Sequence, residues 1–254
     1  MMRVKPMLDM SVTALVVLAA SLVIWRQFVP PGQSQGRPQV ENVEGMIPAE
    51  LTTIARGTGQ VALVEFGDFE CPFCGKHARE TDPQIRKAFV DTGIVRHVFF
   101  NYPLANHVHA APASEAALCA GKQGKFWQMH DALFQKQAAL AHADLADRAR
   151  EIGLEMERFG ECVSGGKERP FMERQQSVAR ELNVRSTPVF FLGFVQGDGS
   201  VVLKKRINGA LPFSDFRSAI VDVTPAELRQ RVGAVALNST VPWFPVRAGV
   251  SRFF

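Results

Sequence analysis

The folded part of the chain begins with a short, almost continuous apolar run. Residues 61–66 read VALVEF, with one acid inside the run. This pattern is typical of a strand that is buried on both faces. A stretch of helical period follows over 73–92, which contains Pro83 and ends before Gly93, and a second apolar run, IVRHVFF, occupies 94–100. Strand, helix and strand form a βαβ unit, which predicts parallel strands and a helix kinked at its proline.

The pattern becomes helical over residues 104–183, which are rich in alanine and broken by glycines. We interpret this stretch as a helical insert. Apolar runs typical of strands return at 187–193 and 200–207, and the GDG sequence between them favours a hairpin turn. Short helices are expected near Pro212 and after Thr224. The order of βαβ unit, helical insert and ββα unit predicts an α/β fold.

The first 29 residues have a different pattern. Arg3 and Lys5 precede an uncharged apolar stretch from Ser11 to Trp25, and Arg26 follows it. This stretch is roughly 23 Å long as a helix, shorter than the ~30 Å hydrocarbon core of a bilayer. Residues 1–29 favour an N-terminal hydrophobic anchor helix, with a cleaved signal peptide and a buried helix as the alternatives. An anchor or a signal places the rest of the chain in a compartment that permits disulfides.

Three further segments complete the predicted organisation. Residues 30–46 are rich in Pro, Gly and Gln without a period, and we expect a spacer there. One folded domain is expected at 47–232. Residues 233–254 show no clear period and are expected to form a C-terminal tail.

Composition narrows the class of protein. The 254 residues are 46% hydrophobic and 21% charged, which suits a packed core. The net charge of +4 is mild, and the longest basic run, 204–206, is typical of a solvated strand end, so no nucleic-acid partner is expected. Four cysteines are too few for a disulfide scaffold, although two pairs can form.

Two cysteines lie two residues apart directly after the first predicted strand, in GDFECPFCGKH. Cys71 and Cys74 suit a redox pair, half of a zinc site or a structural disulfide. Zinc would need a second close pair of Cys or His ligands, which the sequence does not offer, so no metal is expected. A structural disulfide across so short a loop would stabilise little.

The redox interpretation has a physical mechanism. Pro72 favours the first turn of a helix, whose N-terminus stabilises a thiolate at Cys71 and lowers its pKa. Cys74 lies one turn further on and can close an internal disulfide or resolve a mixed one. Asp68 and Glu70 lie close to Cys71, and their charges would oppose its thiolate.

Three motifs together resemble one protein family. VALVEFGDFECPFCGKH, AALCAGKQGKFWQMHDALF and STPVFFLG occur in the order found in the DsbA-like branch of the thioredoxin superfamily, of the thioredoxin_4 type. The resemblance covers about residues 45–232. It implies a thioredoxin fold with an inserted helical subdomain, and an exported thiol:disulfide oxidoreductase. The activity that we expect first is that of a dithiol oxidase, which transfers its Cys71–Cys74 disulfide to folding proteins.

The resemblance also implies roles for single residues. Pro188 is expected to be cis and to face the cysteines, and the Thr187 backbone, with Phe73, is expected to bind an extended substrate chain. Glu65 matches the buried acid of the family. Burial should raise its pKa, and it would accept the proton of Cys74. Some relatives carry histidine where this chain has Phe73, which cannot donate a hydrogen bond to the thiolate.

The other two cysteines, Cys119 and Cys162, lie in the predicted insert. Relatives that resemble this chain carry a pair there, which implies a structural disulfide, and two buried free thiols are the alternative.

The resemblance implies no cofactor. It implies exported protein substrates with cysteines, a membrane redox partner that regenerates the disulfide, and a monomer in the periplasm or cell envelope, held to the membrane by the N-terminal segment. A disulfide reductase or isomerase is the alternative activity. A chaperone or binding module of thioredoxin-like fold without catalysis is the alternative of another class.

Overall fold

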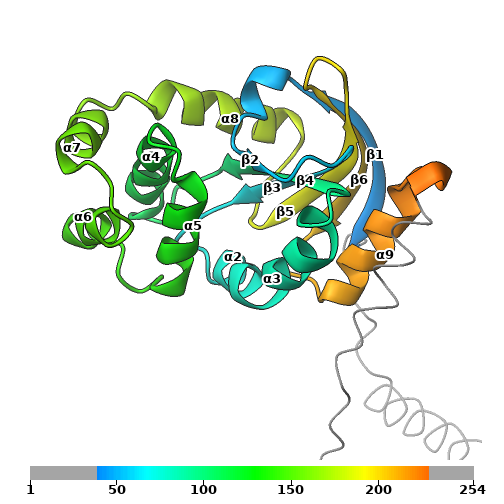
Figure 1. Ribbon diagram of the computed structural model, residues 1–254, viewed down its shortest axis with the longest axis horizontal. Coiled ribbons are helices and arrows are strands. Elements are labelled where there is room, and N and C mark those ends of the chain that lie inside the picture. The colour runs from blue at the N-terminus through cyan, green and yellow to red at the C-terminus, as the bar shows by residue number, and fades with distance from the viewer. Residues whose placement is uncertain (1–38, 229–254) are drawn as a thin grey trace, which may run out of the picture. The chain divides into compact units, whose positions relative to one another are not determined.

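A six-stranded mixed sheet organises residues 39–228, the part of the chain that this computed structural model describes (Figure 1). The strand order is β1-β6-β5-β3-β4-β2. β3 and β4 are parallel, as the βαβ pattern predicts, and the other neighbouring pairs are antiparallel. The strands are β1 (Val40–Ile47), β2 (Ala55–Arg56), β3 (Val61–Gly67), β4 (Val95–Asn101), β5 (Val189–Val195) and β6 (Val201–Asn208).

Helices cover both faces of the sheet, and a helical insert separates β4 from β5. The insert predicted for residues 104–183 is confirmed and comprises α4 to α8, of which α4 to α7 lie together on the left in Figure 1. α9 begins directly after Pro212, where a helix is predicted. The helices are η1 (Ala49–Leu51), α2 (Pro72–Lys76), η2 (His77–Thr81), α3 (Asp82–Ile85), η3 (Arg86–Val90), α4 (Ala110–Gly121), α5 (Phe126–Gln135), α6 (His142–Glu151), α7 (Met156–Ser164), α8 (Arg169–Glu181) and α9 (Phe213–Val223).

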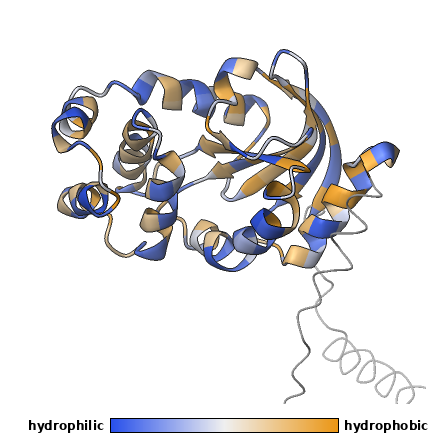
Figure 2. Cartoon of the chain, in the orientation of Figure 1, coloured by the Kyte–Doolittle hydropathy of each residue, from blue (hydrophilic) through white to orange (hydrophobic). Residues whose placement is uncertain are grey.

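Strand β3 is buried along its whole length, as its apolar run predicts. Successive side chains of a strand point to opposite faces of the sheet. Leu63 therefore packs with Phe216 of α9 on one face, and Val64 packs with Ala179 of α8 on the other. Figure 2 shows hydrophobic residues concentrated on the central strands, whereas hydrophobic and hydrophilic residues alternate along the helices.

The sequence predicts one α-helix kinked at Pro83 between β3 and β4. The structure differs from this prediction. The segment consists of α2 and α3, each followed by a π-helical turn, η2 and η3. Pro83 lies at the start of α3 and lacks the N–H that a continuous α-helix needs. The wider π turns let the chain continue in a helical path despite this interruption.

The prediction of a spacer at residues 30–46 is wrong for the C-terminal part of this range. Residues 40–47 form β1, which pairs antiparallel with β6 from Val40–Ile207 to Ile47–Val201. The alternation of apolar and polar residues in VENVEGMI is weak, but pairing with β6 satisfies the backbone of the segment and buries Ile47 completely. The folded domain therefore begins before residue 47.

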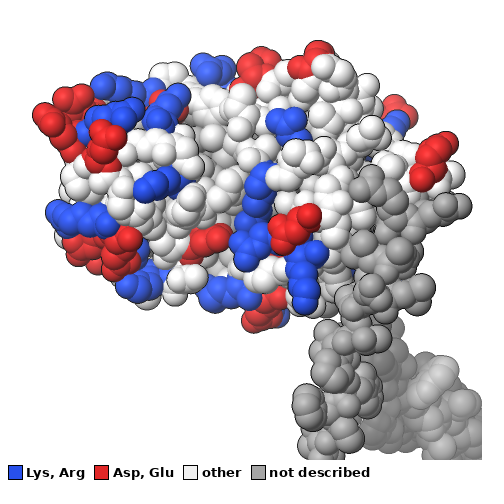
Figure 3. Space-filling model, viewed as in Figure 1, with Lys and Arg blue, Asp and Glu red and all other residues white. Residues whose placement is uncertain are grey.

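Two predicted segments lie outside the described residues, namely the anchor at 1–29 and the tail at 233–254. Within residues 39–228, no helix is both long and apolar enough to cross a membrane. On the face drawn in Figure 3, basic and acidic side chains are interspersed.

The hydrophobic core of the insert includes Met129, Leu145 and Phe159, and it extends to Cys71 and Cys74 after β3. A disulfide joins Cys119 of α4 to Cys162 of α7, with an S–S distance of 2.05 Å. The bond connects residues 43 positions apart, so it limits how far two helices of the insert can separate in the unfolded chain.

Removing this disulfide should lower the free energy of unfolding by about 2–4 kcal/mol, because the unfolded chain gains entropy. The parent chain carries Cys71→Ala and Cys74→Ala, which remove the other two thiols. The variant carries Cys119→Ala and Cys162→Ala in addition to these two substitutions. Urea unfolding of both, without reductant, measures the difference. Equal unfolding midpoints at equal slopes would show that the bond does not stabilise the fold.

Candidate active site

Cys71 and Cys74 lie where β3 leads into α2. Cys71 is the residue before the helix, with an extended backbone, and Pro72 opens the first turn, as predicted. The Gly75 N–H donates to the Cys71 carbonyl at 3.0 Å and so closes this turn. Both cysteines are unbonded thiols, of which Cys71 is 4% exposed and Cys74 is fully buried.

The two thiols differ strongly in acidity. The neighbouring Cys74 thiol, together with N–H groups at the start of α2, lowers the pKa of Cys71 to about 5, although burial opposes this change. Burial, reinforced by the charge of Cys71, raises the pKa of Cys74 well above its usual value. The Asp68 N–H lies 3.5 Å from the Cys74 sulfur. Near neutral pH, Cys71 is therefore a thiolate and Cys74 is a thiol.

The loop before β5 faces the redox turn. The Thr187–Pro188 peptide bond is cis, as the resemblance implies. When protonated, the Cys71 thiol donates a hydrogen bond to the Thr187 carbonyl at 3.3 Å. Residues 116 positions apart in the sequence thus meet at one sulfur.

Glu65 is buried in β3, but the prediction that its pKa is raised is wrong. Burial by itself raises the pKa of this carboxyl group. A hydrogen bond from His97, with Nε2 at 3.0 Å from Oε2, and the positive charge of this histidine outweigh burial and lower the pKa. Glu65 is therefore ionised near neutral pH, and its charge contributes to the raised pKa of Cys74.

Residues 52–205 match the Thioredoxin_4 family, described as thioredoxin. The match covers more than half of the chain and includes the cysteine pair and Thr187–Pro188. The chain belongs to the Thioredoxin_4 family.

Solved structures place this family member within the DsbA-like fold. BdbD of Bacillus subtilis, in its oxidised form, is 22% identical with a TM-score of 0.60, and the alignment covers 72% of this chain and 97% of that one. Alpha-DsbA1 of Wolbachia pipientis is 18% identical with a TM-score of 0.56, over 73% of this chain and 93% of that one. At these identities, the likeness shows the fold.

Relatives among curated proteins are much longer than this chain. The Na(+)/H(+) antiporter NhaA 1 of Salinispora arenicola is 33% identical over 247 residues, which are 90% of this chain but 37% of the relative. The Na(+)/H(+) antiporter NhaA 3 of Salinispora tropica is 38% identical over 133 residues, which are 52% of this chain and 20% of the relative. The chain thus spans well under two thirds of either protein.

A buried ionic network extends from Glu65 and could not be read from the family motifs. His97 of β4 contacts Glu65 through Nε2 and Asp82 of α3 through Nδ1, at 3.4 Å. Arg56 of β2 pairs with Asp82, and its guanidinium lies 4.1 Å from the centre of the Trp127 ring. Hydrogen bonds to Asp82 and Glu65 raise the pKa of His97 despite burial. Arg56 Nη2 also lies 3.1 Å from His97 Nδ1, and the network as a whole contains two carboxylates and two cations, so their charges balance.

The helical insert of this Thioredoxin_4 protein also holds the redox turn, through a residue that no motif indicated. The Gln137 side chain, just after α5, donates to the carbonyls of Phe69 at 2.9 Å and Cys71 at 2.7 Å. Gly75 leaves room for it, because a Cβ atom at residue 75 would lie 2.1 Å from Gln137 Oε1. A side chain at residue 75 would therefore displace the amide of Gln137, which lies more than sixty residues away in the sequence.

Apolar surface remains near the cysteines. Phe73, between them, is 63% exposed, and Val108, in the loop between β4 and α4, is 73% exposed. Within residues 39–228, no cluster of three or more His, Cys, Asp and Glu side chains is arranged to hold a metal ion.

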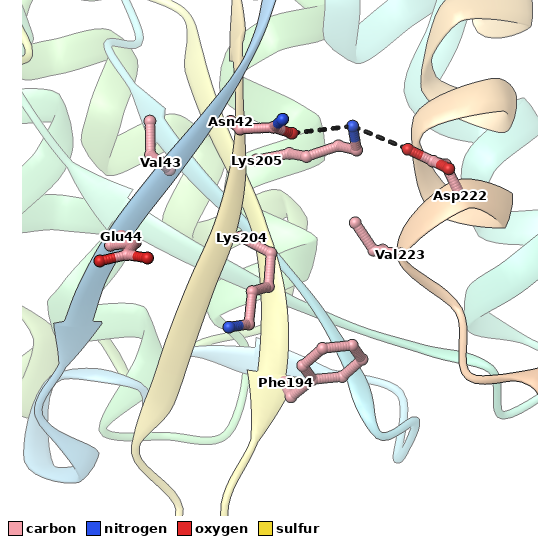
Figure 4. Close-up of a pocket in the computed structure, with 8 residues that line it drawn as sticks. All are labelled: Asn42, Val43, Glu44, Phe194, Lys204, Lys205, Asp222 and Val223. Atoms are coloured by element: carbon pink, nitrogen blue, oxygen red, sulfur yellow. Dashed lines mark hydrogen bonds and ion pairs between the residues drawn. The ribbon is translucent and has the colours of Figure 1, made fainter.

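A groove of about 640 Å³ lies at the other end of the sheet (Figure 4). Its Phe194 pairs with Val61 at the start of β3, roughly 20 Å of strand from Gly67. Figure 4 shows Lys205 between Asn42 and Asp222, with its Nζ 3.1 Å from the amide oxygen and 2.7 Å from the carboxylate. The groove therefore belongs to a region remote from the thiol chemistry.

Asp82→Asn should lower the free energy of unfolding by about 3–5 kcal/mol, because Arg56 and His97 lose a buried counter-charge. The pKa of Asp82 is lowered in the folded chain, so this stabilisation is present at neutral pH and is lost as the pH falls below the ordinary value for aspartate. The control is Asp147→Asn, whose pair with Arg150 is mostly exposed and whose loss should change stability little. Urea unfolding at neutral pH that gave equal losses for both variants would contradict the role of the network.

Proposed function

We propose that this chain is an exported thiol:disulfide oxidoreductase that introduces disulfides into other proteins. The carrying observation is the difference in acidity between its two thiols, with the pKa of Cys71 at about 5 and that of Cys74 raised. A thiol of low pKa is the better leaving group in disulfide exchange. This favours release of an oxidised substrate from Cys71.

Oxidation of a substrate takes two exchanges. A substrate thiolate attacks the Cys71 sulfur of the Cys71–Cys74 disulfide, a mixed disulfide forms, and Cys74 leaves with the electron pair and takes up a proton. A second substrate thiolate then attacks the substrate sulfur of the mixed disulfide, and Cys71 leaves as a thiolate. The substrate gains one disulfide, and two electrons reduce the cysteine pair.

Regeneration of the disulfide passes the two electrons from the cysteine pair to a redox partner. The Cys71 thiolate attacks a disulfide of the partner, and Cys74 must then lose its proton to attack the resulting mixed disulfide. Glu65 is the proposed proton acceptor, because it is buried, ionised and close enough for its charge to raise the pKa of Cys74.

Substrates would bind beside Cys71 as extended chains. The Thr187 backbone, next to the cis Pro188, would pair with the substrate backbone, and exposed Phe73 would contact apolar side chains around the substrate cysteine. The uncharged N-terminal stretch and the Cys119–Cys162 disulfide support export to an oxidising compartment, with anchoring at the membrane and a membrane protein as the redox partner.

Cys71→Ala should reduce the oxidation of a reduced model protein to the uncatalysed rate, because no mixed disulfide can form at the attacked sulfur. Cys119→Ala/Cys162→Ala is the matched control and should keep activity at temperatures where it is folded. Formation of substrate disulfides, followed by mass spectrometry of trapped thiols, is the measurement.

The same assay separates the alternatives. Retained activity in Cys71→Ala would exclude the proposed mechanism. Reduction of insulin that is faster than oxidation of the model protein would assign a reductase, which the absence of a hydrogen-bond donor on the Phe73 side chain favours. Binding of the substrate without exchange would assign a binding module.

Glu65→Gln should slow reoxidation of the reduced protein by glutathione disulfide about tenfold or more, since Cys74 loses its proton acceptor. Glu115→Gln is the control, because Glu115 is also buried but pairs with Arg169 of α8. Circular dichroism must show both variants folded at the assay temperature. Equal reoxidation rates for Glu65→Gln and the natural chain would exclude the proton role.

A further inference from the structure

A buried carboxylate, Asp68, links both cysteines to the loop between β4 and α4. Its backbone contacts the redox turn, because its N–H donates to the Cys74 sulfur at 3.5 Å and its carbonyl accepts from the Cys71 N–H at 3.1 Å. Its side chain is fully buried and contacts the loop: Oδ2 accepts from the Leu104 N–H at 2.8 Å and lies 2.8 Å from Nδ1 of His107. One residue therefore connects the thiols to an imidazole.

The carboxylates of Asp68 and Glu70, which lie beside Cys71, accept hydrogen bonds that reduce their repulsion of the Cys71 thiolate. Asp68 Oδ1 accepts from the Glu70 N–H at 2.7 Å, so both carboxylate oxygens of Asp68 have donors. The Glu70 carboxylate accepts from the His109 N–H at 2.6 Å, which holds the same loop at a second point. His107 supplies the positive charge in this group.

We propose that the Asp68–His107 pair is the electrostatic partner of Cys71, with the His107 imidazolium offsetting the Asp68 charge and so setting the acidity and reactivity of the thiolate. His107 is a positioning residue, which acts on the sulfur through Asp68 and through its charge. The inference rests on the proposed thiol chemistry of Cys71. It places a histidine from a distant loop beside a redox turn whose own two intervening residues, Pro72 and Phe73, carry no charge.

The charged groups that face His107 all raise the pKa of its imidazole. Burial lowers the pKa of His107, but the hydrogen bond to Asp68 and the charges of Asp68, Cys71 and Glu70 outweigh it and raise the pKa. His107 is therefore a cation in the reduced protein below that raised pKa, and its support of the thiolate is lost as the pH rises through it. Coupling between two sites is reciprocal, so oxidation of Cys71 must lower the pKa of His107.

The test is a pH titration of the Cys71 thiolate by its ultraviolet absorbance in the reduced full chain. In the natural chain the midpoint is expected at about 5. His107→Gln keeps a hydrogen-bond donor but removes the charge, and it should raise the midpoint by about 0.5–1 pH unit. His109→Gln is the matched control. Its side chain is on the same loop, whereas its contact with Glu70 is through the backbone, so the midpoint should not change.

A double variant separates charge from loop structure. In Asp68→Asn/His107→Gln the pair is neutral, so the midpoint should return toward that of the natural chain. A midpoint that does not move in His107→Gln, or that stays raised in the double variant, would overturn the proposal, the second outcome showing that the pair only holds the loop.

A measurement on the natural chain keeps the proposal testable if the variants do not fold. The imidazole of His107, titrated by NMR, should have a higher pKa in the reduced chain than in the oxidised chain, and equal values would overturn the coupling. Neither titration uses a substrate. Their failure is thus distinct from failure of the proposed function, which the Cys71→Ala assay decides.

Discussion

Stabilisation of a negative charge on the Cys71 sulfur is the constraint on which the rest of the site depends. The residue is 4% exposed, so water supplies little of the hydrogen bonding that a thiolate requires. The start of α2 and the Cys74 thiol supply it instead. Because the same burial keeps Cys74 protonated, one arrangement of backbone and burial gives one cysteine a low pKa and its neighbour a raised pKa.

This arrangement requires a rigid turn, and the helical insert contributes to its rigidity. Gln137 binds the carbonyls on either side of Glu70, and the Arg79 guanidinium donates to the Phe134 carbonyl of α5 at 2.8 Å. The disulfide between α4 and α7 braces the subdomain from which Gln137 comes. The insert therefore supports the site, and its hydrophobic core is continuous with Cys71 and Cys74.

Beneath the thiols, ionised groups are retained at a cost of desolvation. Glu65, His97, Asp82 and Arg56 are all largely buried, and each is stabilised only by its neighbours in the network. Breaking one pair leaves an uncompensated charge, which costs far more than the pair contributes net. The lowered pKa of Glu65 follows from this network, and it keeps the carboxyl group ionised near neutral pH.

The sequence by itself determined the order of the main elements from β3 onward, the burial of strand β3, the insert and the position of Cys71 and Cys74 at the start of a helix, because hydrophobic period and the CPFC motif depend on neighbouring residues only. It did not determine β1, which is a strand because β6 pairs with it, nor the sign of the Glu65 pKa shift. Burial of that acid was foreseeable, but His97 lies on another strand and Asp82 on a helix, and only the tertiary structure brings them together. The same holds for Gln137 and His107. Hydrogen bonds between residues far apart in the chain depend on distances that no local pattern encodes.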